Sequence, residues 1–129
     1  MQPPYNLYGH VFLGVDNIDL RREICTANRY NPEVLSVSDF RMRLTDAQFY
    51  FADWGNPEMV ENLIKSMQCS HEEATASTPM SACGTELSVV YTVKVITSIG
   101  IHNFICHIQG NETHGVVLVD MKGLDVLPM

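Results

Sequence analysis

The sequence predicts an α+β domain, in which an antiparallel sheet (an N-terminal strand plus a C-terminal three-strand meander) is packed on one face by about three helices. Apolar and polar residues alternate in 5–15 and again through 87–121, which is the period of a half-buried strand. Between these stretches, apolar residues recur at the helical spacing of three and four. A chain of 129 residues can bury its own core, so we expect a single domain over 1–129 with a flexible start at 1–4.

The first strand and the first helix occupy the N-terminal part of the chain. Two glycines inside 5–15 indicate a bend or a bulge in that strand. Asp16 or Asn17 then provides the N-cap of a helix that runs to about Asn28. Pro32 ends this segment, because the residue before a proline avoids the helical region.

Residues 36–54 fit two different structures. A helix is indicated by five large apolar or small residues at helical spacing, namely Phe40, Leu44, Ala47, Phe51 and Trp54. A strand is indicated by the alternation in 40–44. In a strand Arg41 and Arg43 project side by side and could grip an anion, whereas in a helix they diverge by about 200°. Because Arg, Met and Leu favour helix, we predict the helix.

A further helix and a long loop follow. Gly55 suits the end of one helix, Asn56 caps the next, and Pro57 suits its first turn. This helix ends near Gln68, and its buried side is predicted to carry Val60, Leu63, Ile64 and Met67. Residues 69–85 are rich in Ser and Thr, so we expect a long loop there.

The stretch 87–121 is predicted as three antiparallel strands, over 87–96, 101–109 and 113–121. Gly110 and Asn111 fit a two-residue hairpin turn, because glycine adopts positive φ without a steric clash. Ile99 and Gly100 are expected to form the earlier turn. With this register, His107 faces His114 across two strands.

One face of this meander is a core face, and the reverse face has a mixed character. Polar residues on the reverse face are Thr92, Lys94, Asn103, His107, His114 and Asp120, interleaved with Ile96, Ile105, Val116 and Leu118. Such a face is too apolar for a plain solvent surface and too polar for a core. We therefore expect a partner chain or a ligand to cover it.

Composition and charge exclude some classes of function. The net charge of −7 argues against duplex nucleic acid as a partner, since duplex binding needs basic surface. No apolar run approaches the roughly 20 residues of a membrane span, and the N-terminus lacks a basic region followed by an apolar core, so we expect no membrane partner and a cytoplasmic protein. In that reducing compartment the cysteines are expected to be free thiols: Cys25, Cys69, Cys83 and Cys106.

Two groups of residues could carry metal or nucleophilic chemistry. His107 and His114 could hold zinc with Asn103 or Asp120 near them, and the alternative is a solvated pair close to the end of a hairpin. A second group, in the predicted loop, consists of Cys69, His71 and Cys83. Its spacing matches none of the usual zinc patterns, although a thiolate next to an imidazole could also act as a nucleophile with its base.

The basic residues point to an anionic ligand. Five of the eight are arginines between 21 and 43, and the planar fork of arginine binds phosphate and carboxylate bidentately. The alternative is that these arginines lie on the solvated sides of two helices. The contact candidates for such a ligand are Arg41, Arg43, Lys94, Asn103, His107 and His114.

We therefore expect a non-enzymatic binding protein without a cofactor. It would self-associate as a homo-oligomer and capture a small anionic, nucleotide-like molecule or a partner protein. A short acidic chain of this kind is typical of viral and mobile-element accessory proteins. The alternative function is a small hydrolase that depends on a metal or on a Cys/His pair, because the sequence contains imidazole and thiolate candidates but no phosphate loop and no serine elbow.

Overall fold

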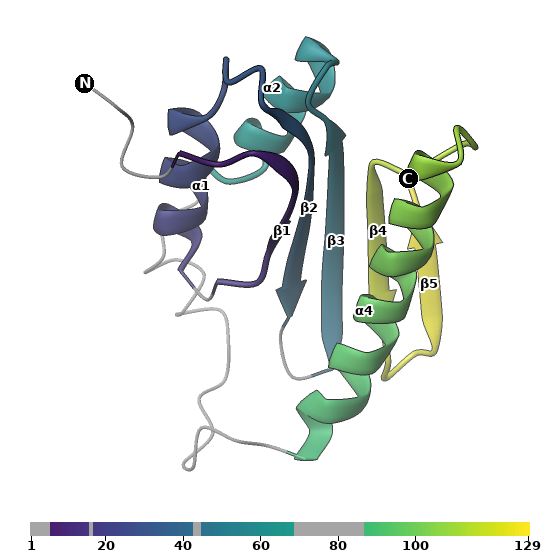
Figure 1. Ribbon diagram of the computed structural model, residues 1–129. Coiled ribbons are helices and arrows are strands. Elements are labelled where there is room, and N and C mark those ends of the chain that lie inside the picture. The colour runs from purple at the N-terminus through teal and green to yellow at the C-terminus, as the bar shows by residue number, and fades with distance from the viewer. Residues whose placement is uncertain (1–5, 16, 43–44, 69–86) are drawn as a thin grey trace. The chain divides into compact units, whose positions relative to one another are not determined.

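The computed structural model describes residues 6–15, 17–42, 45–68 and 87–129, and these contain three helices and one five-stranded mixed sheet (Figure 1). The strands lie in the order β1-β2-β3-β4-β5. The predicted α+β class is confirmed, whereas the prediction of a purely antiparallel sheet is wrong. The predicted flexible start and the predicted loop at 69–85, with its cysteine and histidine candidates, lie outside the described residues.

The chain divides into two compact units. The first consists of Met1–Val37 and Phe51–Pro79, and the second of Ser38–Tyr50 and Met80–Met129. Two long strands, β2 (Val34–Met42) and β3 (Asp46–Asp53), contribute residues to both units. Each unit has its own set of packed elements.

The first unit contains β1 (Gly9–Leu13) and α1 (Ile18–Ala27), and α1 connects β1 to the start of β2. β1 and β2 run in the same direction, which makes the sheet mixed (Figure 1). The α1 helix begins at the predicted cap, because the side-chain oxygen of Asn17 accepts hydrogen bonds from the backbone N–H groups of Asp19 (2.8 Å) and Leu20 (3.3 Å). This helix was therefore predicted at the correct residues.

The helix α2 (Pro57–Lys65) also belongs to the first unit and follows its prediction closely. The side chain of Asn56 accepts from the N–H groups of Glu58 and Met59, and Pro57 occupies the first turn. All four residues predicted on its buried side are buried: Val60, Leu63, Ile64 and Met67. Nearby, the indole Nε1 of Trp54 donates to the carbonyl of Asn28 at 2.8 Å.

The helix predicted for 36–54 is wrong, because β2 and β3 occupy these residues. The strand interpretation of 40–44 is the correct one for Phe40, Arg41 and Met42. Propensity favoured a helix here, but pairing with neighbouring strands outweighs the small preferences of Arg, Met and Leu. The alternation in β3 is clear in its burial, since Ala47, Phe49 and Phe51 are buried while the residues between them are partly exposed.

The predictions for 87–96 and 101–109 are also wrong, because one helix of 22 residues, α4 (Leu87–Ile108), replaces two strands and a turn. Its buried residues recur at helical spacing: Thr92, Ile96, Gly100 and Asn103. The alternation typical of a strand was misleading here. Apolar residues occupy the exposed side of this helix as well as its buried side, so an alternating pattern arises by chance. Val and Ile lower helix propensity only slightly, and packing decides the outcome.

Gly100, predicted in a turn, is instead a place where α4 packs closely within the second unit. A Cβ atom at this position would overlap the ring of Phe40 and lie 3.0 Å from Cε2 of Phe49. These two rings are themselves in contact, with centroids 5.2 Å apart. The glycine is therefore required by the close approach of α4 to β2 and β3.

The predicted hairpin turn at Gly110 and Asn111 is a helix end. Gly110 has a φ of +74°, its N–H donates to the carbonyl of His107 at 3.1 Å, and the N–H of Asn111 donates to the carbonyl of Cys106 at 2.8 Å. These two bonds form the pattern by which a left-handed glycine closes a helix. His107 and His114 are therefore not neighbours across two strands, and the predicted register of the meander is wrong.

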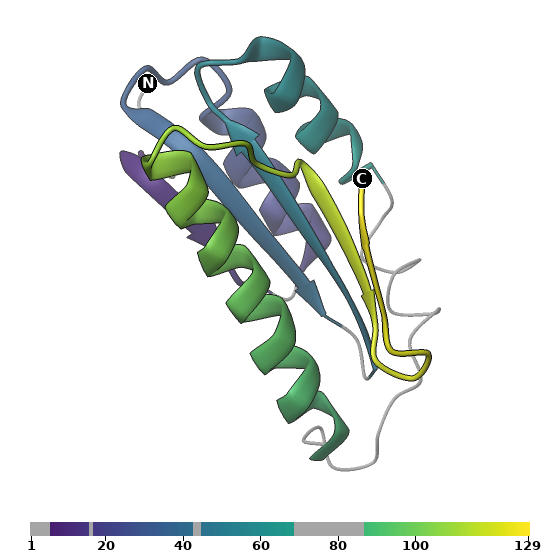
Figure 2. The same ribbon diagram turned by 90° about the vertical axis from the view of Figure 1, so that its right-hand side faces the viewer.

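The rest of the second unit is an antiparallel pair, β4 (Val116–Asp120) and β5 (Asp125–Pro128). β4 lies within the predicted strand at 113–121, whereas β5 was not predicted. β4 pairs with β3, and the pairs Ala47↔Val119 and Phe49↔Val117 are buried. Figure 2 shows α4 lying along one side of these strands.

Candidate functional site

Arg41, the first of the predicted contact residues, is engaged within the second unit. Its Nε donates to Oδ2 of Asp39 at 2.7 Å, and its guanidinium carbon lies 3.9 Å from the ring centroid of Tyr50. Asp39 is fully buried. The arginine thus neutralises a buried carboxylate and stacks on an aromatic ring. Arg43 lies outside the described residues.

Asn103 and His114 are brought together, but through the backbone of the histidine. Oδ1 of Asn103 accepts a hydrogen bond from the N–H of His114 at 2.8 Å, and Asn103 is only 4% exposed. This bond ties the segment after α4 back onto the helix. The imidazole of His114 is exposed.

Lys94 and His107 lie at other places on α4. Lys94 is exposed and precedes Asn103 by nine residues, which corresponds to about 13 Å along a helix. His107 is half-buried near the C-terminal end. Of the five predicted residues that the structure describes, Asn103 and His114 are brought together by a hydrogen bond, while Lys94 lies elsewhere on α4. In the described part of the chain, no three His, Cys, Asp or Glu side chains gather in a way that could hold a metal ion.

The exposed side of α4 is unusually hydrophobic. We define the outer side of α4 as six exposed residues at helical spacing: Val90, Lys94, Ser98, Ile101, Ile105 and Ile108. The three isoleucines are 45%, 46% and 57% exposed, respectively. Lys94 is the one charged residue in the sequence of α4. A helix that packs against a sheet normally presents charged and polar residues to water, so this surface calls for an explanation.

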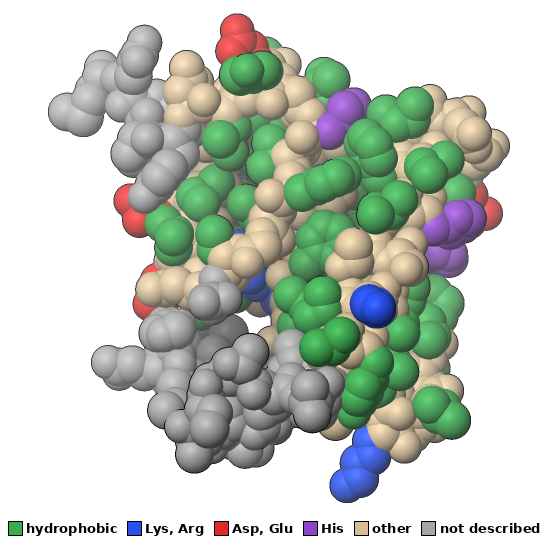
Figure 3. All heavy atoms as spheres, turned by 60° about the horizontal axis from the view of Figure 1, so that its bottom comes forward, with side chains coloured by type: hydrophobic (Ala, Val, Ile, Leu, Met, Phe, Trp, Pro, Cys, Tyr) green, Lys and Arg blue, Asp and Glu red, His purple; other side chains and the backbone are tan. Residues whose placement is uncertain are grey.

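Figure 3 shows one face of the molecule with its side chains coloured by type. Many hydrophobic side chains are exposed on this face, with Lys, Arg and His groups between them and acidic groups near its edges. Single exposed apolar residues are normal on proteins, but contiguous apolar surface marks a place of contact.

Exposed hydrophobic residues also occur on β5. Val126 is opposite Val119 in the β4–β5 register, so it lies on the face of the sheet that α4 also contacts through Phe49. Val126 is 51% exposed, and β5 is at the edge of the sheet in the described residues. The other exposed apolar residues of this C-terminal segment are Leu124, Leu127 and Met129. An edge strand with exposed apolar side chains is a further point of association.

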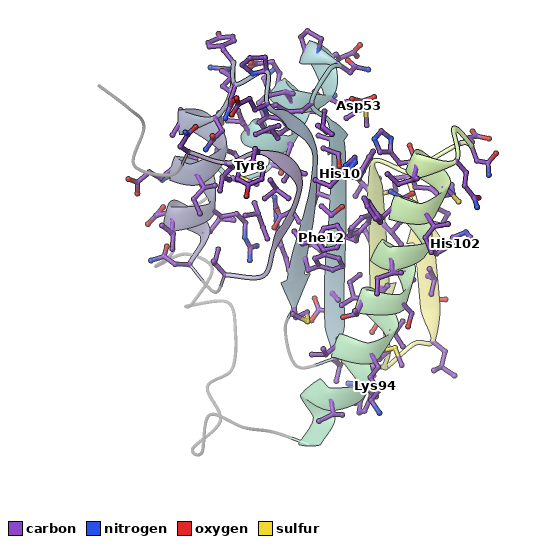
Figure 4. All side chains as sticks on the ribbon, in the orientation of Figure 1. Tyr8, His10, Phe12, Asp53, Lys94 and His102 are labelled. Carbon is purple, nitrogen blue, oxygen red and sulfur yellow. The ribbon has the colours of Figure 1, made fainter. Side chains whose placement is uncertain are left out.

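A thiol and an imidazole meet beside the outer side of α4. Sγ of Cys106 lies 3.6 Å from Nε2 of His102, one helical turn earlier. His102 is exposed and projects from the helix into solvent (Figure 4), and Cys106 is half-buried with a free thiol. Helical spacing of four would have revealed this pair in the sequence, but the strand prediction placed the two residues at different positions along one strand.

One further polar pair lies in the first unit. Nδ1 of His10, on β1, is 2.7 Å from Oγ of Ser36, on β2. Ser36 is fully buried, so its hydroxyl is not presented to a substrate. His10 lies between Tyr8, which precedes β1, and Phe12 of β1, and both aromatic residues are exposed (Figure 4).

Comparison with known proteins assigns no family. No protein-family model matches the chain, and no curated protein is significantly similar to it. Among the residues that the structure describes, no helix combines the length and the apolar character needed to cross a bilayer. The geometry of the outer side of α4 is therefore the best guide to function.

Proposed function

We propose that this chain is a non-enzymatic binding protein that self-associates through the outer side of α4 together with the exposed residues of β5. The observation that supports this function is the run of half-exposed isoleucines, Ile101, Ile105 and Ile108, on a helix that packs within the second unit through its buried residues. Burying such surface in a second molecule releases water from apolar groups, which is the main driving force of association.

A second copy of the chain fits this surface better than a highly charged partner. The chain has a net charge of −7, yet the sequence of α4 contains no acidic residue. Two copies can therefore bring these helices together without burying carboxylates against one another. A two-fold arrangement would pack this side of α4 against the same side of the second copy, as in isologous dimers.

The available area indicates a weak dimer. The outer side of α4 extends about 28 Å from Val90 to Ile108, and a strip about 10 Å wide with β5 beside it offers roughly 450 Å² per copy. Standard stable interfaces use about 800 Å² per partner, and transient ones use less. We therefore expect a dimer that dissociates on dilution in the micromolar range, about −8 kcal/mol in binding free energy.

Capture of a small anion through Arg41 and Arg43 stays a prediction. Arg41 already has a carboxylate partner in Asp39, so an anion would have to compete with that ion pair. We therefore place self-association first and anion capture second.

Sedimentation velocity over a dilution series, with a metal chelator present, tests the proposal. The expected result is a sedimentation coefficient that rises smoothly from the monomer value towards the dimer value as concentration increases. A strict monomer up to millimolar concentration would exclude a second copy as the occupant of this surface. A large assembly that does not respond to changes on α4 would place the contact elsewhere.

A further inference from the structure

The pair His102 and Cys106 has the geometry of two ligands of one metal ion. Zinc lies about 2.0–2.1 Å from imidazole nitrogen and about 2.3 Å from thiolate sulfur, so two such ligands at a tetrahedral angle are about 3.5 Å apart. The observed separation between Nε2 and Sγ is 3.6 Å. Residues four apart on a helix share a side, which is how paired ligands on one helix reach the same ion.

The pair supplies only half of a closed site. Structural zinc requires four protein ligands, and the described residues contain no third His, Cys, Asp or Glu close enough to complete a set. We propose that His102 and Cys106 form half of a zinc site, and that a second copy of the chain, docked through the outer side of α4, supplies the same two residues as the other half. This inference rests on the proposed self-association.

The surroundings suit such a site. Ile101 and Ile105 immediately precede the two ligands in the sequence, and both are half-exposed on the outer side of α4. In a dimer they would exclude water around the metal, which strengthens metal–ligand bonds. Two thiolates and two neutral imidazoles balance the charge of Zn²⁺, so the complete site is neutral and can be buried at an apolar contact. Each Cys106 thiol releases its proton to solvent when zinc binds.

Zinc then strengthens a contact that is weak by itself. A ligand that binds only the dimer lowers the apparent dimer dissociation constant by about 100-fold when its free concentration is 100 times its own dissociation constant. Zinc concentration would thereby control how much of the protein is assembled.

The test uses the full-length chain, reduced and freed of metal, titrated with Zn²⁺ and separately with Co²⁺. We expect one metal ion per two chains, a sedimentation coefficient at the dimer value, and a Co²⁺ spectrum with tetrahedral d–d bands and a thiolate charge-transfer band. The substitutions His102→Ala and Cys106→Ser should each abolish these three signals.

Two control variants exclude other ligands. His107→Ala changes the next imidazole on α4, and the double variant Cys69→Ser/Cys83→Ser removes the thiols that precede α4 in the sequence. Both should bind metal as the unmodified protein does. The inference fails if metal binding survives both His102→Ala and Cys106→Ser, if one metal binds per chain without a change in mass, or if no metal binds.

The sedimentation series with chelator separates this inference from the proposed function. A chelated protein that dimerises at high concentration but binds no zinc at His102 and Cys106 refutes the inference alone. A protein that remains monomeric both with chelator and with zinc refutes both. Dimerisation that is stronger with zinc than with chelator, and that loses this gain in Cys106→Ser, supports the inference.

Discussion

Replacement of Ile105 by alanine should weaken the dimer without unfolding the chain. Complete burial of an isoleucine side chain is worth about 1.5–3 kcal/mol, and Ile105 is 46% exposed, so about 1 kcal/mol is still to be gained when a partner covers it. In a two-fold contact each dimer contains two copies of the change. Ile105→Ala should therefore cost about 2 kcal/mol of association free energy, which is roughly a 30-fold higher dimer dissociation constant.

The assay is sedimentation velocity on metal-free protein, with Leu35→Ala as the matched control. Leu35 is 51% exposed on β2, in the first unit, so its truncation removes a similar amount of exposed apolar surface from an element other than α4. Alanine is a better helix former than isoleucine, and thermal unfolding should show that Ile105→Ala keeps its stability. The reasoning is refuted if Ile105→Ala leaves the dissociation constant unchanged, or if Leu35→Ala raises it equally.

Two further predictions concern the packing of the second unit. Gly100→Ala should lower the free energy of unfolding by about 1 kcal/mol, because the added methyl group overlaps the ring of Phe40; Gly14→Ala, where the new Cβ would meet nothing within 4 Å, should be close to neutral in the same urea titration. Asp39→Ala should lower the free energy of unfolding by about 3–5 kcal/mol. The reason is that the side chain of Arg41, which is only 13% exposed, would lose its carboxylate partner. Asp19→Ala, which breaks the exposed ion pair with Arg22, should lower the free energy of unfolding by less than about 1 kcal/mol. Equal losses of stability in Asp39→Ala and Asp19→Ala would contradict the role given to burial.

The parts of the fold that could be predicted from sequence are those with local signals. Asn17 and Asn56 are capping residues followed by apolar residues at helical spacing, and each cap depends only on neighbours in the sequence. The helices α1 and α2 were therefore found where they were expected. Gly110 was also recognised as a residue with positive φ, although it ends a helix and does not form a hairpin.

The prediction failed for elements whose exposed side is as apolar as their buried side. In α4, Ile101 and Ile105 face away from the core while Ile96 is completely buried, so hydrophobicity alone does not separate the two sides. Strand and helix then fit the same residues, and β-branched side chains favoured the wrong choice. In β2, the fully buried Ser36 and Ser38 gave no apolar signal at all.

The prediction of the candidate site depended on the choice between strand and helix for the residues of α4. The prediction that the stretch containing Lys94 and His107 carries a semi-apolar exposed surface came from the residues themselves, but the strand geometry grouped the wrong side chains. His102 and Cys106 were missed as a pair because residues four apart are neighbours only in a helix. A local signal was present in Gly110, because glycine suits the position just after a helix and would have favoured a helix up to Ile108.

Isoleucine methyl NMR across a dilution series tests the central claim most directly, since it reports both association and its location. The protein is labelled at isoleucine δ1 methyl groups and kept with chelator. We predict that the signals of Ile101, Ile105 and Ile108 shift with concentration, while those of Ile18 and Ile64, buried in the first unit, stay fixed. Constant signals for the three α4 isoleucines, or equal shifts for Ile18 and Ile64, would contradict self-association through the outer side of α4.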